Sequence, residues 1–132
     1  MIVTSSGARP DLAAHDDAVR LTPEVLVKEL RALLGARLVA YLGQVQETRA
    51  VRQWADGTRA ISSRDVEQRL RVAYQVARLI TVRDSTGVAQ AWFQGMNPHL
   101  QDQAPATVLR DGALAADGPR VLAAARAFAA AG

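Results

Sequence analysis

The sequence contains no cysteine, and aromatic residues make up only 5% of its 132 residues. Without cysteine the chain cannot form a disulfide, a thiolate nucleophile or a cysteine-based zinc site. His15 and His99 lie far apart in the sequence and in dissimilar contexts, without the His/Asp/Glu spacing that a structural metal site has. A glycine-rich phosphate loop is also absent. We therefore expect neither a metal site nor a cofactor.

Long apolar runs are absent as well. No stretch approaches the roughly 20 apolar residues that span a bilayer, and the N-terminus lacks a charged segment followed by an apolar one. A catalytic site is equally hard to find, because no Ser/His/Asp set has a plausible base and the paired carboxylates Asp16 and Asp17 lie near the N-terminus. These absences predict a cytoplasmic, non-enzymatic protein without a membrane partner.

Small apolar residues dominate what is present. Hydrophobic residues account for 49% of the sequence and many of them are alanines, which favours closely packed helices over sheets. We predict an all-α fold without strands, in one compact domain or two small lobes sharing a core. Residues 1–21 contain Gly7 and Pro10 and show no sustained apolar period, which predicts a flexible leader.

Capping signals and apolar spacing divide the rest of the chain into helices. The predicted helices run from Pro23 to Leu34, through Leu38 to Gly43, from Glu47 or Thr48 to about Ala55, from Arg64 to Val82, from Ser85 to Gly95, from Pro105 to Leu109 and from Pro119 almost to Gly132. Gly43 is expected to be a left-handed C-cap. We assign residues 22–63 to a DNA-binding region, and residues 64–132 to a long spine helix followed by a small C-terminal helical module.

Positive charge is concentrated in the middle of the chain. Between Arg37 and Arg83, nine arginines stand against four acidic residues, a net charge of +5, while the rest of the chain has seven basic and nine acidic residues, or −2. A basic segment of this kind is typical of nucleic-acid-binding proteins, although a solvated arginine-rich helix face would produce the same distribution.

The segment from Leu38 to Ile61 has the pattern of a helix-turn-helix, with an apolar first helix, a small residue at the reversal and an amphipathic second helix. Val51 and Trp54 can face the core together because they are three residues apart. The side chains left for DNA are Thr48, Arg49, Arg52 and Gln53 on the second helix and Arg59 in the loop after it. Arginine can donate two hydrogen bonds to guanine, glutamine can pair twice with adenine, and Arg59 is better placed for a phosphate. The alternative is an ordinary helical hairpin with a charged second helix.

The residues from Trp54 to Arg59 resemble the end of the recognition helix in Xre-type regulators, where a tryptophan, an acidic residue, a glycine and a basic residue follow one another. The resemblance implies that double-stranded operator DNA is a partner. Because one helix-turn-helix has a small footprint, we expect a homodimer or higher homo-oligomer on a palindromic or repeated site.

A second motif lies between Ala91 and Gly112. An aromatic helix end is followed by an Asn-Pro turn, a leucine, and a proline that can open a short helix. Its defining residues are Trp92, Asn97, Leu100, Pro105, Leu109 and Gly112. A purely structural role is the alternative for the first three, because Leu100 can pack beside Trp92 in the core.

This motif and the last predicted helix resemble the toxin-binding domain of MbcA/ParS/Xre-type antitoxins, and with the helix-turn-helix the resemblance covers residues 30–132. It implies that the C-terminal module covers the active-site entrance of an NAD-consuming, RES-type toxin, and that the helix-turn-helix represses the shared operon. The candidate toxin contacts are Trp92, Asn97, Leu100, Pro105, Leu109, Arg126, Phe128 and the terminal residues Ala129 to Gly132. Alternatively, Phe128 packs on Val121 and Leu122 as part of the core.

Two functions explain these features almost equally well. The first is an antitoxin that represses its own operon, and the second is a stand-alone transcription regulator that uses its C-terminal module to dimerise. A small enzyme is a third possibility, but the sequence offers it little chemistry.

Overall fold

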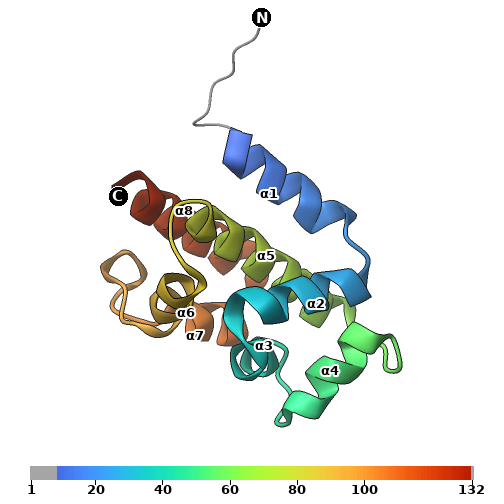
Figure 1. Ribbon diagram of the computed structural model, residues 1–132. Helices are drawn as coiled ribbons and strands as arrows, with labels where there is room; N and C mark the ends of the chain where they lie inside the picture. Colours follow the sequence, from blue (N-terminus) through green and yellow to red (C-terminus); the bar gives the residue numbers. More distant parts are fainter. Residues whose placement is uncertain (1–8, 132) are drawn as a thin grey trace, which may run out of the picture.

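A computed structural model describes residues 9–131 of the chain. Within this range the protein consists of α-helices and one short 3-10 turn, without a β-strand (Figure 1), so the prediction of an all-α fold is confirmed there. The elements are α1 (Arg9–Arg20), α2 (Pro23–Leu34), α3 (Ala36–Leu42), α4 (Thr48–Asp56), α5 (Arg64–Thr81), α6 (Thr86–Gln94), η1 (Pro98–Leu100), α7 (Pro105–Asp111) and α8 (Leu114–Ala131). No helix in the described range is long and apolar enough to cross a membrane.

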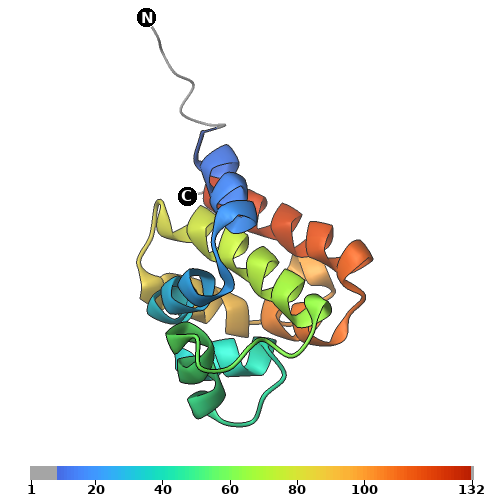
Figure 2. The ribbon, with the colours of Figure 1, turned by 90° about the vertical axis from the view of Figure 1, so that its right-hand side faces the viewer.

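The helix α5 lies at the centre of the fold. Its N-terminus is capped by Ser63, whose hydroxyl accepts a hydrogen bond from the Val66 amide at 3.2 Å. The helices α1, α2 and α8 all pack against α5 (Figure 2), and ten of its 18 residues are buried. One hydrophobic cluster runs from Ala18 to Ala125, so the described helices share a single core.

The segment predicted as a flexible leader contains a helix. Residues 9–20 form α1, while residues 1–8 lie outside the described range. Ala14 and Ala18 are one turn apart and buried, and such small side chains allow close helix packing without producing a strong apolar pattern in the sequence. The prediction for residues 9–20 is therefore wrong. This helix packs through small alanines and through hydrogen bonds to α5, and it does not need a stripe of large apolar side chains.

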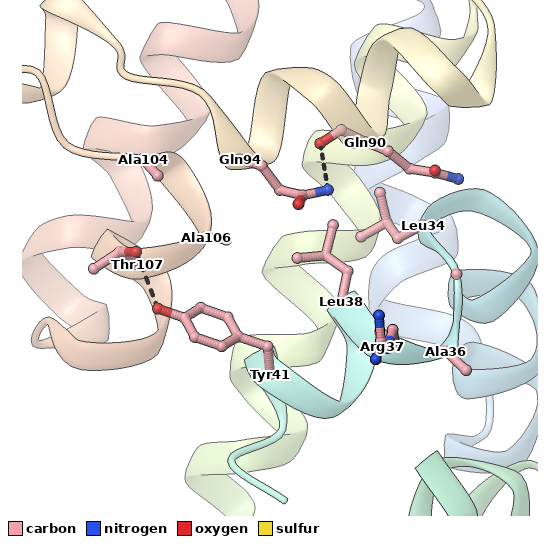
Figure 3. A pocket seen from close by; sticks show the side chains of 11 residues that line it. Leu34, Ala36, Arg37, Leu38, Tyr41, Gln90, Gln94, Ala104, Ala106 and Thr107 are labelled. Carbon is pink, nitrogen blue, oxygen red and sulfur yellow. Dashed lines mark hydrogen bonds between the residues drawn. The ribbon is translucent and has the colours of Figure 1, made fainter. Parts of the chain in front are cut away.

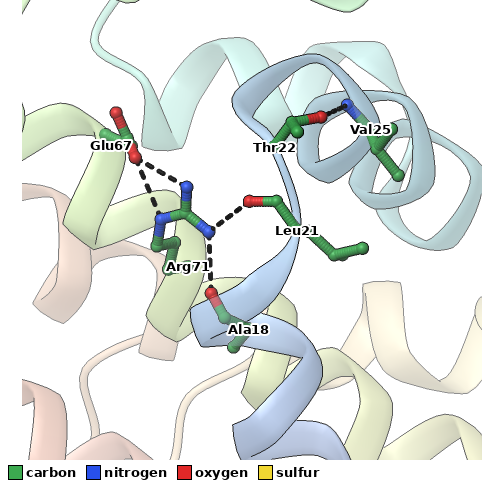
Figure 4. A network of polar contacts seen from close by, with 6 residues as sticks. All are labelled: Ala18, Leu21, Thr22, Val25, Glu67 and Arg71. Atoms are coloured by element: carbon green, nitrogen blue, oxygen red, sulfur yellow. Dashed lines mark hydrogen bonds and ion pairs between the residues drawn. The ribbon is translucent and has the colours of Figure 1, made fainter.

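Arginines on α5 hold α1 in place. The Arg71 guanidinium donates hydrogen bonds of 2.8 Å to the carbonyl oxygens of both Ala18 and Leu21, while it also pairs with Glu67 at 2.7 Å (Figure 4). Arg78 pairs with Asp17 at 3.0 Å and donates to the Tyr74 hydroxyl. Burial raises the pKa of the Tyr74 phenol, an effect that Arg78 opposes.

The last helix begins earlier than predicted. We expected Pro119 to open it, but α8 starts at Leu114 and contains Pro119 in its second turn. The Asp117 carboxylate accepts hydrogen bonds from the Ala113 amide at 3.0 Å and from Arg120 at 2.7 Å, which stabilises the helix start. Pro119 has no amide hydrogen to donate to the carbonyl oxygen one turn earlier, yet α8 continues through it, so proline alone does not mark the first residue.

Candidate functional site

The helix α4 is amphipathic, as the sequence predicts. Ala50, Val51 and Trp54 are buried, and Trp54 is only 2% exposed. On the opposite side, Thr48 and Arg52 lie one turn apart, next to the pair Arg49 and Gln53, which are also one turn apart. Thr48, Arg49 and Arg52 are exposed and Gln53 is partly exposed. Four of the predicted DNA-binding residues therefore share one surface.

The fifth predicted residue, Arg59, joins this surface from the loop after α4. Arg59 lines the same shallow hollow as Arg49 and Gln53. We call it the α4 hollow, and its lining consists of Val45, Gln46, Glu47, Arg49, Ala50, Gln53 and Arg59. The loop begins at Gly57, which adopts a left-handed conformation (φ 77°). The amides of Thr58 and Arg59 both donate to the carbonyl oxygen of Gln53, at 3.0 and 3.3 Å. These bonds hold the start of the loop against the end of α4.

A second hollow adjoins the first and contains residues that the sequence did not single out. It is lined by Arg37, Ala40, Tyr41, Val45, Gln46, Thr48 and Arg110. Arg37 comes from α3 and Arg110 from α7, which is far away in the sequence. The sequence signal for Arg37 was its membership of the basic segment, whereas nothing in the sequence placed Arg110 beside α3.

Most arginine side chains on this surface are exposed and unpaired within the described range. Arg37, Arg52 and Arg59 are exposed, and none of them forms an ion pair with another residue of the described range. Arg49 pairs with Glu47 at 3.5 Å, but both side chains are largely exposed, so this pair is weak and screened by salt. The surface is therefore electropositive and can accept phosphate groups.

The turn between α3 and α4 differs from its prediction. Gly43 is not left-handed (φ −81°), and the next residue, Gln44, takes the left-handed conformation instead (φ 60°). A Cβ at residue 43 would lie 2.8 Å from the Trp54 ring, so a glycine is needed here for close approach. The Trp54 indole packs directly on the turn that leads into its own helix.

In the C-terminal module, several predicted partner-binding residues are part of the core. Leu100, Pro105 and Leu109 are buried. Asn97 is 7% exposed, and its carboxamide oxygen accepts a hydrogen bond from the His99 amide at 2.9 Å. Its backbone oxygen accepts from the amides of Leu100 and Asp102. Asn97 therefore holds the turn together, and the side chains of all four residues offer little surface to a partner.

Trp92 and Phe128 form an aromatic part of the accessible apolar surface of this module, which also includes Met96, 81% exposed. Their ring centroids lie 6.3 Å apart, and Trp92 also meets Phe93 edge to face at 5.5 Å. Phe128 is 37% exposed, so it is not an ordinary core residue.

Arg126, another predicted contact, pairs with Asp11 of α1 at 2.7 Å. Gly132, the last predicted contact, lies outside the described residues.

A groove of about 620 Å³ lies where α3, α6 and α7 meet. Leu34, Leu38 and Ala106 form apolar parts of its wall, and Gln90 and Gln94 line it from α6 (Figure 3). Tyr41 and Thr107 also line the groove, and their hydroxyl groups are hydrogen-bonded at 3.0 Å. The groove thus borders the contact between α3 and α7.

A second contact ties α7 to the central helix. Arg69 of α5 is 8% exposed, and its Nε donates to the carbonyl oxygen of Leu109 at 2.9 Å. Burial lowers the pKa of this guanidinium from its ordinary value, while Asp65 acts in the opposite direction. Arginine stays protonated under physiological conditions, so Arg69 supplies a positive charge near the C-terminal end of α7.

Comparisons with protein-family models, curated proteins and solved structures found no match to this chain.

Proposed function

We propose that this chain is a helix-turn-helix DNA-binding protein, in which α3 and α4 form the motif and α4 enters the major groove. The observation that supports this proposal best is the division of α4 into two faces. Ala50, Val51 and Trp54 attach it to the core, while Thr48, Arg49, Arg52 and Gln53 share its outer surface. An exposed helix with such side chains has the chemistry of base readout.

The residues have distinct roles in this proposal. Arg52, in the middle of the exposed face and without an ion-pair partner in the described range, donates two hydrogen bonds to a guanine. Gln53 pairs with an adenine. Arg59 and Arg49 border the α4 hollow and hold the backbone phosphates on one side of the groove.

The C-terminal module is proposed to bind another protein. The supporting observation is the aromatic pair of Trp92 and Phe128, which leaves apolar surface exposed, since aromatic residues are enriched where proteins associate. In view of the resemblance to MbcA/ParS/Xre-type antitoxins, we propose that the partner is an NAD-consuming, RES-type toxin. The protein would neutralise the toxin by covering its active site and would repress the shared operon as a dimer.

A stand-alone dimeric regulator is the second candidate, because the same aromatic pair could join two copies of this chain. Co-purification with the products of the neighbouring genes distinguishes the two. The antitoxin proposal predicts a complex with an NAD-consuming enzyme, and NAD consumption that falls when this protein is added. A homodimer with no such partner would favour the stand-alone regulator.

DNA binding itself is tested with a duplex library that has a randomised central segment. The parent protein should select a consensus sequence and bind it more tightly than a scrambled duplex of the same composition, with an affinity that falls as salt is raised. Failure to discriminate between the two duplexes would contradict the proposal.

A further inference from the structure

The turn before α4 is attached to the C-terminal module. The Gln44 carboxamide nitrogen donates to the backbone oxygen of Arg110 at 3.0 Å. In the other direction, Arg110 Nη1 donates to the backbone oxygen of Tyr41 at 2.7 Å, and the guanidinium lies 4.6 Å from the centroid of the Tyr41 ring. With the Tyr41 and Thr107 hydroxyl pair, these contacts form what we call the α3–α7 seam.

The backbone of Gln44 explains why this attachment matters. Its φ of 60° is a left-handed conformation, which is unfavourable for a residue with a Cβ. The Trp54 ring packs directly on the neighbouring Gly43, where a Cβ would lie 2.8 Å from the ring. The turn is therefore held between α4 on one side, through Trp54, and α7 on the other, through the side chain of Gln44.

Arg110 stabilises the same turn from its other end. Tyr41 is the penultimate residue of α3, and its carbonyl oxygen already accepts the Gln44 amide at 3.2 Å. This oxygen also carries part of the negative charge at the helix C-terminus, so a guanidinium that donates to it adds a charge-assisted hydrogen bond. Arg110 also pairs with its neighbour Asp111 at 3.4 Å, but the bond to Tyr41 is the shorter one.

We propose that Gln44 and Arg110 are positioning residues for DNA readout, through which the C-terminal module sets the orientation of α4. The inference rests on the proposed function of α4. Base contacts require side chains to be held within a fraction of an ångström, whereas phosphate contacts tolerate small displacements. Loosening the seam should therefore weaken binding to the selected sequence more than binding to a scrambled one.

Two independent variants test this inference. Gln44→Gly removes the side-chain tie but keeps the left-handed turn accessible, because glycine adopts positive φ without cost. Arg110→Ala removes the bond to Tyr41 but leaves the backbone oxygen that Gln44 uses. The matched control is Gln101→Gly, since Gln101 is another exposed, left-handed glutamine (φ 57°) in the C-terminal module and contributes nothing to the seam.

Fluorescence anisotropy with the selected and the scrambled duplex gives the ratio of the two affinities, and thermal unfolding is followed in parallel. Gln44→Gly loses a neutral, exposed hydrogen bond and should lower this ratio about fivefold, whereas Arg110→Ala loses a charged donor and should lower it about tenfold. Gln101→Gly should keep the parent ratio.

If the seam has only a structural role, the two variants should lower the unfolding temperature without changing the ratio of affinities. This result would overturn the inference but not the proposed DNA-binding function. A parent protein that does not distinguish the two duplexes would overturn the proposed function and the inference together. Both variants remain informative even if one of them folds poorly, because they break different bonds.

Discussion

Arg71 and Arg78 of α5 are used in the opposite way to Arg52 and Arg59 around α4. Arg71 pairs with Glu67 at 2.7 Å and Arg78 with Asp17 at 3.0 Å. Around α4, Arg52 and Arg59 have no such partner within the described range and stay exposed. A neutralised arginine stabilises the fold, whereas a free one is available to an anionic ligand. Arg64, at the start of α5, is also exposed and forms no ion pair within the described range. The candidate DNA surface is therefore marked by unpaired arginines that lie beside the exposed face of α4.

The largest expected effect concerns the two tryptophans. Trp54 is 2% exposed and packs on Gly43, so Trp54→Ala should lower the free energy of unfolding by about 3–5 kcal/mol. Trp92→Ala is the matched control, because this indole is only partly buried; it should cost much less stability and should weaken binding to the partner protein. Chemical denaturation measures both variants. An equal loss of stability would contradict the distinction between a core and a surface tryptophan.

The next prediction tests the arginines that hold α1. Arg71→Ala leaves the carbonyl oxygens of Ala18 and Leu21 without their donor, which should cost about 1–3 kcal/mol. The amides of α1 should exchange faster with solvent, while DNA affinity stays unchanged. Arg126→Ala removes a more exposed pair with Asp11 and should cost at most about 1 kcal/mol. If loss of Arg71 reduced DNA binding without affecting α1, the separation of the two regions would be wrong.

Base readout is tested by Arg52→Ala. The variant should lose about 1–3 kcal/mol of affinity for the selected duplex, with a change in unfolding free energy within about 0.5 kcal/mol, because the side chain is exposed. Arg120→Ala removes the same charge from α8, where the arginine is paired with Asp117. Affinity measurements should show parent-like DNA binding for this control. A similar loss in both variants would mean that only net charge matters.

The smallest expected effect is that of Arg59→Ala. A phosphate contact contributes equally to all sequences, so affinity for the selected and the scrambled duplex should fall by the same factor. The slope of log affinity against log salt should decrease by about 0.9 for one lost phosphate contact. Titrations at several salt concentrations measure this slope. An unchanged slope would place Arg59 away from the DNA backbone.

Local signals in the sequence predict many helix boundaries. Thr22 caps α2 and Ser63 caps α5, and both hydroxyl groups accept a hydrogen bond from the amide three residues later. The predicted burial of Val51 and Trp54 is likewise confirmed. These features depend on residues close together in the chain, so their spacing is enough to predict them.

The features that the sequence did not predict depend on distant contacts. Gly43 has the residue type of a left-handed cap, but the Trp54 ring occupies the neighbouring space and the left-handed residue is Gln44. The α1 helix depends on Arg71 and Arg78, more than 50 residues away from their partners on that helix. Arg110 reaches α3 from a separate part of the chain. Helical periodicity carries no information about such approaches.

The most direct test of the proposed DNA surface is an amide NMR titration of the parent protein with the selected duplex. We predict that the largest shifts fall on Thr48, Arg49, Arg52 and Gln53 and on the loop containing Arg59, while α1 and α8 change little. Shifts concentrated on α1 or α8, with those of α4 unchanged, would contradict the central claim that α4 binds DNA.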